Sequence, residues 1–298
     1  MPNTRLITAE FAYHRPKRIE DALTLLALPG ARVLAGGTDI LIRMKMGEVR
    51  AAALVQVVDI PELRVLEFNS ALAIGAAVPL YQLEEEPRLA ERFSALHEAV
   101  LSLGSVQVRA MATLAGNLCN ASPAADLAGP LMALGAEVEI ASISGGRVER
   151  RSVSVESFFT GPGTTVLRPG EMLVAVHVPQ QSEGSGSAFL KLGRVSMDIS
   201  KMSASAWVQR KGEKIAAIRL ALGGVAPRPV RPHGVEEALC GASFGPQAVA
   251  QALQRVQESI SPIDDVRSTA EYRREMSGLF LGDAIRKAWL RAGKEKNV

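Results

Sequence analysis

Residues 31–41 have the sequence ARVLAGGTDIL, an apolar run followed by two glycines and a polar turn. The apolar run Ala31–Ala35 predicts a strand that ends at two glycines, and Thr38–Met46 predicts a helix with Thr38 as its N-cap. Glycines let a ligand approach the backbone, and a helix start offers free N–H groups with a partial positive charge. The segment is suited to hold a phosphate. It lacks the third glycine of a dinucleotide fingerprint, and taken alone such a pattern more often marks a plain turn.

A second polar segment, VQVRAMATLAGNLCNASPAAD at residues 106–126, places threonine, glycine and asparagine close together. We expect a loop over Arg109–Ala124 and a helix over Ala125–Leu134. Hydroxyl, amide and backbone groups in such a loop can hydrogen-bond a polar ligand. Asp126 lies at the predicted helix start, where it either accepts hydrogen bonds from sugar hydroxyls or acts as an N-cap, and both roles stay open.

The remaining patterns predict an α+β fold. Helices are expected at Ile19–Leu28, Pro79–Glu86, Ala90–Leu103, Gly234–Leu239, Pro246–Ile260 and Ala270–Leu290. Strands are expected at Leu54–Val58, Leu72–Ala76, Ala136–Ile143, Val148–Val153, Glu171–Val178, Ala188–Leu192, Met202–Arg210 and Ile215–Leu222. The small, polar stretch QQSEGSGS, residues 180–187, predicts a linker. It separates an N-terminal domain at 1–179, with subdomains at about 1–58 and 59–179, from a C-terminal domain at 188–298.

Composition narrows the class of protein. The net charge is +3, from 34 basic and 31 acidic residues, and the basic residues are scattered, so no nucleic-acid partner is expected. Cys119 and Cys240 are too few to hold an iron–sulfur cluster or zinc within this chain, and they suit a reducing compartment. No apolar run reaches the roughly 18 residues of a membrane span, and the first residues lack a secretory pattern. We therefore expect a cytoplasmic protein without a membrane span.

Together, the two polar segments resemble the FAD-binding medium subunit of the molybdenum hydroxylases, the family of carbon monoxide dehydrogenase and xanthine dehydrogenase. Three further stretches carry the same resemblance: SFFTGPGTTVLRPGEMLVAVHVP at 157–179, LGGVAPRPVR at 222–231 and STAEYRREM at 268–276. The likeness covers essentially the whole chain in order. It implies a PCMH-type FAD-binding domain of two subdomains, followed by a C-terminal domain with a small antiparallel sheet and a helix bundle.

The resemblance also implies which residues contact the cofactor. Backbone N–H groups of Gly36–Asp39 would donate to the FAD diphosphate, and Lys191 would approach the isoalloxazine together with the loop Arg194–Ile199. The complete implied cofactor-binding set is Val33, Leu34, Ala35, Gly36, Gly37, Thr38, Asp39, Ile40, Leu103, Thr113, Ala115, Gly116, Asn117, Asp126, Leu173, Lys191 and Ile199. No catalytic or metal-binding residue is expected. Neither segment contains histidine, so FAD should be non-covalent, and Ala115 replaces a glycine of many relatives, which requires a backbone that accepts a methyl group.

Such a chain would be an oxidoreductase subunit that relays electrons. A small subunit with two [2Fe–2S] clusters would deliver them to FAD, a large molybdopterin subunit would oxidise the substrate, and the assembly would be a dimer of heterotrimers. NAD+, a quinone or another molecule would be the acceptor. Two alternatives stay open, a free-standing FAD-dependent oxidoreductase of the same fold and a scaffold subunit without FAD. An absorbance spectrum separates them, because flavin bands exclude the scaffold and bleaching by substrate without partners indicates the free-standing enzyme.

Overall fold

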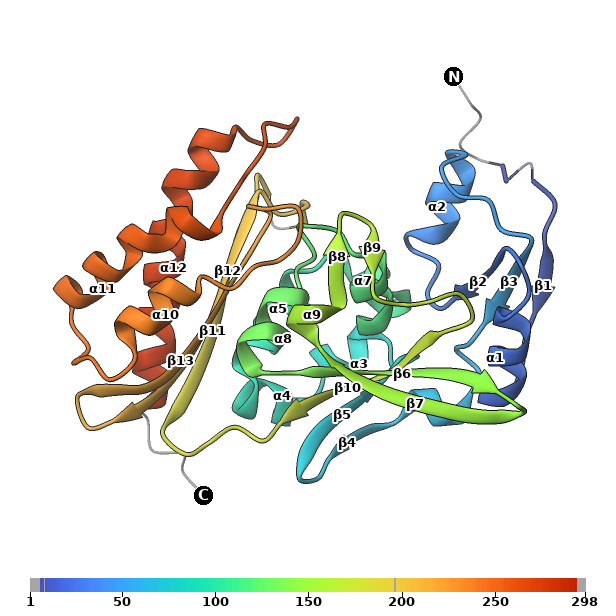
Figure 1. The fold of residues 1–298 in the computed structure, drawn as a ribbon, viewed down its shortest axis with the longest axis horizontal. Coiled ribbons are helices and arrows are strands. Elements are labelled where there is room, and N and C mark those ends of the chain that lie inside the picture. The colour runs from blue at the N-terminus through green and yellow to red at the C-terminus, as the bar shows by residue number, and fades with distance from the viewer. Residues whose placement is uncertain (1–5, 8, 196, 294–298) are drawn as a thin grey trace.

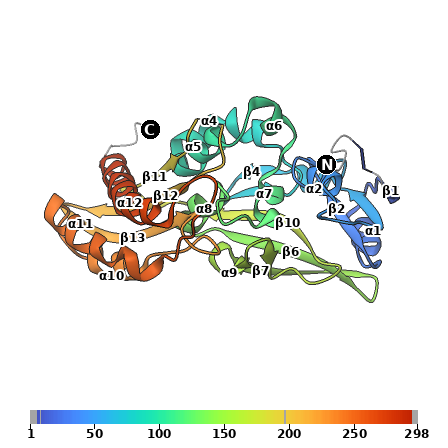
Figure 2. The same cartoon turned by 90° about the horizontal axis from the view of Figure 1, so that it is seen from above.

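The computed structural model describes residues 6–7, 9–195 and 197–293, with the sheets arranged along the long axis of the molecule (Figure 1). A parallel three-stranded sheet lies at one end, an antiparallel five-stranded sheet in the centre and an antiparallel three-stranded sheet at the other end. Helices pack against these sheets, as the view from above shows (Figure 2). This architecture confirms the expected α+β class. No helix within the described ranges is both long and apolar enough to cross a membrane.

The N-terminal unit is built on parallel strands in the order β1-β3-β2. Its elements are β1 (Ala12–His14), α1 (Ile19–Leu26), β2 (Ala31–Leu34), α2 (Ile40–Lys45) and β3 (Ala53–Gln56). Neighbouring parallel strands cannot be joined by a tight hairpin, and the helices supply the crossovers. The glycine turn therefore lies at the carboxyl end of β2, directly before α2. Strand β1 was not expected, because three residues are too few to show an alternating pattern.

The central unit carries the antiparallel sheet β4-β5-β10-β6-β7. Its strands are β4 (Leu66–Phe68), β5 (Ala71–Gly75), β6 (Glu137–Ser144), β7 (Arg147–Ser154) and β10 (Met172–Pro179), with the small pair β8 (Phe159–Gly161) and β9 (Thr164–Thr165) beside it. Its helices are η1 (Pro61–Arg64), α3 (Leu80–Glu84), α4 (Pro87–Arg92), α5 (Ser94–Ser102), α6 (Val106–Met111), α7 (Leu114–Asn120), α8 (Ala128–Leu134) and α9 (Val155–Phe158).

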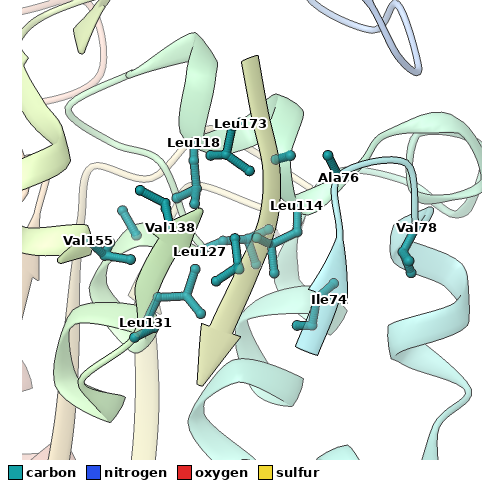
Figure 3. Close-up of a cluster of buried hydrophobic side chains, with 14 of the residues drawn as sticks. Ile74, Ala76, Val78, Leu114, Leu118, Leu127, Leu131, Val138, Val155 and Leu173 are labelled. Atoms are coloured by element: carbon teal, nitrogen blue, oxygen red, sulfur yellow. The ribbon is translucent and has the colours of Figure 1, made fainter. Parts of the chain in front are cut away.

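An apolar cluster fixes α7 on this sheet (Figure 3). Leu114 and Leu118, four residues apart on one face of α7, are 1% and 0% exposed, and Leu173 of β10 is 2% exposed. Full burial of a leucine side chain contributes about 1.5–3 kcal/mol. Because the apolar face of α7 is anchored in this way, the position of its N-terminal turn and of its polar side chains is fixed as well.

The C-terminal unit is a β-meander covered by helices. It comprises β11 (Ser185–Leu192), β12 (Met202–Lys211), β13 (Lys214–Gly223), α10 (His233–Leu239), α11 (Pro246–Leu253), η2 (Gln254–Ser259) and α12 (Ala270–Ala292). Alternate residues of β12 face opposite sides, so Trp207 joins the core of the central unit while Ala206 and Val208 join the core beneath α12. Strand β11 begins at Ser185, so its first three residues lie inside the stretch 180–187 that was expected to be a linker.

Three expected elements differ in the structure. The expected loop Arg109–Ala124 contains α6 and α7, two helices too short to show a clear period in the sequence. The helix expected over Ala90–Leu103 is interrupted at Phe93, where a buried ring accompanies a non-helical backbone (φ −133°, ψ 48°), so α4 and α5 are separate. The helix expected over Pro246–Ile260 is α11 continued by the tighter turn η2.

Glu98 of α5 links the central unit to the C-terminal unit. Its carboxylate accepts from the backbone N–H of Phe189 at 2.9 Å, from Lys287 Nζ at 2.9 Å and from the Arg291 guanidinium. Burial by itself would raise the pKa of Glu98, but the hydrogen bonds from Arg291 and the Phe189 amide outweigh it and the pKa lies below its ordinary value. The carboxylate therefore stabilises the fold when it is ionised.

The variant Glu98→Gln should unfold more easily at neutral pH by about 1.5–3 kcal/mol, the usual contribution of hydrogen bonds to a charged group. Because the folded-state pKa is depressed, this deficit should be full above the ordinary pKa of 4.5 and should shrink as the pH falls further, since the wild-type carboxylate then protonates. Urea unfolding of both proteins at several pH values measures this difference in the free energy of unfolding. Exposed Glu91, in the adjacent α4, provides the control Glu91→Gln, and an equal loss there would contradict the linking role of Glu98.

Candidate functional site

The structure brings the two polar segments into direct contact. A Cβ atom added to Gly36 would lie 2.0 Å from the carbonyl oxygen of Met111, so the turn after β2 touches the α6–α7 junction with no space between them. Asn120 Nδ2 also donates to Asp39 Oδ1 at 3.0 Å. We call residues 36–40 and 113–117 together the cradle. Its two halves come from different subdomains and are more than 70 residues apart in sequence.

The first half of the cradle presents unused backbone donors. Gly37 has φ +73°, a left-handed conformation that favours glycine. Among the hydrogen bonds of the described chain, none uses the backbone N–H groups of residues 36–40. Helix α2 starts at Ile40, with Asp39 at the N-cap position and no side-chain cap, so the expectation that Thr38 caps this helix was wrong. Burial raises the pKa of Asp39 despite the opposing charge of Arg43.

The second half of the cradle is the start of a helix rather than a loop. Thr113 caps α7, because its Oγ1 accepts from the backbone N–H of Gly116 at 3.0 Å. Ala115 lies inside the first turn of α7 and has a negative φ, so the methyl group that replaces a glycine of many relatives is tolerated without strain. Helix α7 ends at Asn120, and the C-cap residue Ala121 adopts φ 49°.

Beyond α7 lies a buried ion pair. Lys191 Nζ of β11 donates to Asp126 Oδ2 at 2.7 Å and to the carbonyl oxygen of Ser102 at 2.9 Å. Both side chains of the pair are less than a tenth exposed. Burial raises the pKa of Asp126, and the charge and hydrogen bond of Lys191 oppose that rise. Helix α8 begins at Ala128 with Leu127 at its N-cap, so Asp126 is not a helix cap, and the partner that the structure gives it is Lys191.

Two buried oxygen atoms beside the cradle lack a hydrogen-bond donor. They are Asp126 Oδ1 and Asn117 Oδ1, neither of which contacts a donor in the described part of the chain. Leaving a buried acceptor unpaired costs about 1–3 kcal/mol, and such groups in native proteins usually meet a ligand or water. Unused N–H groups on the turn after β2 and unused acceptors on Asn117 and Asp126 suit a ligand that carries both anionic phosphates and hydroxyl donors. These residues fit FAD.

A pocket of about 420 Å³ adjoins Lys191. One wall is the turn between α5 and α6, and the other is the end of β11 with the loop after it. We call it the α5–α6 pocket, and it is lined by Leu101, Ser102, Gly104, Ser105, Val106, Arg109, Lys191, Gly193, Val195 and Met197. Several of these side chains are apolar and exposed, which suits contact with a flat ring system.

The other expected site residues lie in varied places. Leu103 ends α5 and is 9% exposed, beside the α5–α6 pocket. Ile199 is 58% exposed in the loop after β11, where Arg194 and Asp198 form an ion pair at 2.6 Å. Leu173 does not join the cradle, because its side chain points into the core beside Leu118 (Figure 3). Val33, Leu34 and Ala35 lead from β2 into the glycine turn.

The structure places two further residues at the site, to which the sequence motifs assign no role. Asn120 bonds Asp39 across the cradle, and Arg109 lines the α5–α6 pocket. The helical spacing of Asn117 and Asn120 is the signal that would have placed both amides on one side of α7, had that helix been expected.

Family models match both parts of the chain. Residues 9–181 match the FAD binding domain in molybdopterin dehydrogenase, and residues 187–288 match the CO dehydrogenase flavoprotein C-terminal domain. The chain belongs to the FAD-binding medium subunits of the molybdenum hydroxylases. The resemblance drawn from the sequence motifs is thereby confirmed, as are FAD as the cofactor and the oxidoreductase class.

Individual relatives are similar over nearly their whole length. The xanthine dehydrogenase FAD-binding subunit of Escherichia coli O157:H7 is 34% identical, over 95% of this chain and 97% of that protein. The carbon monoxide dehydrogenase medium chain of Hydrogenophaga pseudoflava is 32% identical, over 96% and 99%. A solved carbon monoxide dehydrogenase from Hydrogenophaga pseudoflava superposes with a TM-score of 0.91, 31% identity and coverage of 96% and 99%. Quinoline 2-oxidoreductase from Pseudomonas putida 86 superposes with a TM-score of 0.88, 27% identity and coverage of 96% and 99%.

Proposed function

We propose that this medium subunit holds FAD across the cradle and relays electrons inside a multi-subunit molybdenum hydroxylase. A small iron–sulfur subunit supplies the electrons from its [2Fe–2S] clusters, and a large molybdopterin subunit oxidises the substrate. NAD+, a quinone or another molecule accepts the electrons from FAD. The assembly is a dimer of heterotrimers in the cytoplasm. The observation that best supports this proposal is the contact of Gly36 with Met111, because it places the two glycine segments side by side as one binding surface.

Different residues of the chain contact different parts of the cofactor. The backbone N–H groups of residues 36–40 donate to the diphosphate, and the start of α7 holds it from the other side. Asn117 Oδ1 and Asp126 Oδ1 accept hydrogen bonds from the cofactor. Lys191 pairs with the Asp126 carboxylate and orients it. Leu103 and Ile199 contact the ring system, whereas Leu173 supports α7 from the core. FAD, when bound, supplies the redox chemistry, and the protein supplies position and electrostatics.

Two measurements test this function. The purified chain should show flavin absorbance bands at a ratio near one FAD per chain, and their absence would favour the scaffold alternative. Mixing the FAD-loaded chain with its reduced iron–sulfur partner should bleach the flavin band rapidly, whereas organic substrates without partners should leave it unchanged. Bleaching by a substrate alone would contradict the relay role and would support the free-standing enzyme.

The variant Gly37→Val should retain at least about tenfold less FAD than the wild type. A left-handed conformation costs a non-glycine residue about 1–2 kcal/mol, more with a β-branched side chain, and 1.4 kcal/mol corresponds to tenfold. The added Cβ would also lie 2.8 Å from Leu41 Cδ1. The FAD-to-protein ratio after gel filtration measures the loss. Both tryptophans lie on elements of the C-terminal unit, with Trp207 facing the core of the central unit, and their emission wavelength should stay native.

Gly47→Val is the matched control for this variant. Gly47 also has a left-handed φ of +75°, but nothing lies within 4 Å of the position of its added Cβ. The control should therefore suffer similar backbone strain but keep its FAD, because Gly47 lies after α2 and its distortion moves none of the N–H donors of residues 36–40. Stoichiometric FAD in the Gly37→Val protein would contradict the role of the turn.

A further inference from the structure

We propose that Arg109, paired with Glu84, is a positioning residue that fixes the α5–α6 turn as one wall of the flavin pocket. This inference rests on the proposed function, because it takes the α5–α6 pocket to receive the ring system of the cofactor. Arg109 touches no reacting atom in this account. It acts through the backbone of Leu103 and Gly104.

The hydrogen bonds of the Arg109 guanidinium define two directions. Toward α3, Nε donates to Glu84 Oε2 at 2.7 Å and Nη2 donates to Glu84 Oε1 at 3.0 Å, a bidentate pair. Toward the turn, Nη1 donates to the carbonyl oxygens of Leu103 at 3.1 Å and of Gly104 at 3.2 Å. The Arg109 side chain is only 8% exposed. The guanidinium therefore ties the turn to α3, a helix that does not line the pocket.

Leu103 packs in the core, and hydrogen bonds hold the rest of the turn in place. Gly104 adopts a left-handed φ of +53°, and Ser105 then caps α6. The last carbonyl groups of a helix have no partner inside that helix, so the carbonyl of Ser102, the last residue of α5, needs an outside donor. Lys191 supplies it, and Arg109 bonds the carbonyls of Leu103 and Gly104 in the turn that follows. This favourable placement of positive charge at a helix C-terminus also suits the helix dipole.

The turn is also the wall of the pocket. Gly104, Ser105 and Val106 line the α5–α6 pocket on one side, facing Lys191 and Val195 on the other. A shift of the turn would change the width of the pocket. Arg109 makes no hydrogen bond to residues 36–40, so the shift would reach that half of the cradle only through the end of α6, where Met111 contacts Gly36. Loss of Arg109 should thus alter the surroundings of the flavin ring before it weakens the grip on the diphosphate.

A second ion pair of the same chemistry serves as a control. Arg151 donates from Nε and Nη2 to Glu171 at 2.9 and 2.6 Å, and Nη2 also donates to the carbonyl of Val166 at 3.1 Å. It too is a bidentate pair that anchors a turn in the central unit. None of these three residues lines the α5–α6 pocket. Removing Arg151 therefore tests what the loss of such a pair does to the fold alone.

The experiment compares Arg109→Met, Glu84→Gln and Arg151→Met in the full chain loaded with FAD. Readouts are the visible circular dichroism of the bound flavin and hydrogen exchange of the peptide that covers residues 101–108. Arg109→Met should retain FAD, change the flavin dichroism and speed exchange of this peptide at least about tenfold, since its anchoring bonds are lost. Glu84→Gln should change the flavin dichroism and the exchange rate of this peptide in the same direction, by a smaller factor. Arg151→Met should leave both at wild-type values and speed exchange near Val166 instead.

Wild-type dichroism and exchange in Arg109→Met would overturn the inference, as would equal changes in Arg151→Met. If Arg109→Met does not fold, Glu84→Gln decides, because it keeps the shape of the side chain and removes only the charge. Failure of the proposed function is distinguishable from failure of this inference. If Gly37→Val retains its full FAD, the cradle does not hold the cofactor, regardless of the result for Arg109→Met. If Gly37→Val loses FAD but Arg109→Met shows wild-type dichroism and exchange, only the positioning role of Arg109 is refuted.

Discussion

Gly36→Ala is expected to strip this chain of most of its FAD, although the change adds a single methyl group. The new carbon would lie 2.0 Å from the Met111 carbonyl oxygen and 2.9 Å from the Ala112 nitrogen. Both are backbone atoms, so no side chain can rotate away, and the turn after β2 must separate from the α6–α7 junction. Overpacking of this kind costs about 1–3 kcal/mol or more, which corresponds to FAD binding at least about fivefold weaker.

Titration of FAD into flavin-free protein measures this effect. Gly245→Ala is the control, because nothing lies within 4 Å of its added Cβ and its φ of −174° is ordinary extended backbone. The control should bind FAD like the wild type. Wild-type affinity in Gly36→Ala would mean that the close contact between the two halves of the cradle has no bearing on the cofactor.

Lys191→Met is expected to cause the largest loss of stability among single substitutions at the site. It leaves the Asp126 carboxylate buried without its cation, and breaking a buried pair by removing one partner costs about 3–5 kcal/mol. The Lys287→Met variant is the control, since Lys287 is 40% exposed and its partner Glu98 keeps Arg291. Exposed pairs contribute about 0–1 kcal/mol, so a small loss is expected there. Chemical denaturation of both variants gives the comparison.

The loss in Lys191→Met should depend on pH. Burial raises the pKa of Asp126 and Lys191 opposes the rise, so removing Lys191 moves the folded-state pKa further above the ordinary value of 3.8. A group whose folded-state pKa is raised penalises folding as the pH climbs through that pKa, because ionisation is then easier in the unfolded chain. The deficit should therefore be larger at pH 8 than at pH 5. An equal deficit at both values would show that Asp126 is not left charged and buried.

The sequence motifs located both halves of the cradle but not how they meet. Two glycines after an apolar run can be recognised in the sequence alone. The Asn120–Asp39 hydrogen bond cannot, because it depends on the rotation of α7 about its axis. Helices α6 and α7 have six and seven residues, about two turns each, which is too short for a reliable apolar period. The segment was therefore expected to be a loop, and the cap formed by Thr113 was missed.

Burial explains the remaining differences between sequence and structure. Phe93 packs near Phe68 in the core of the central unit and breaks a helix that the sequence pattern alone would continue. Leu173 looks like any apolar strand residue, and only the packing of α7 on β10 shows that its side chain faces the core. By contrast, the strands of the C-terminal sheet were close to their expected bounds, because long alternating runs such as Met202–Lys211 leave little freedom.

A crystal structure of the chain with FAD bound should place diphosphate oxygens about 2.7–3.2 Å from backbone nitrogens of residues 36–40 and from the first turn of α7. It should also place the flavin ring in the α5–α6 pocket beside Lys191. Diphosphate density away from both halves of the cradle, or a flavin ring outside that pocket, would contradict the proposed binding of FAD.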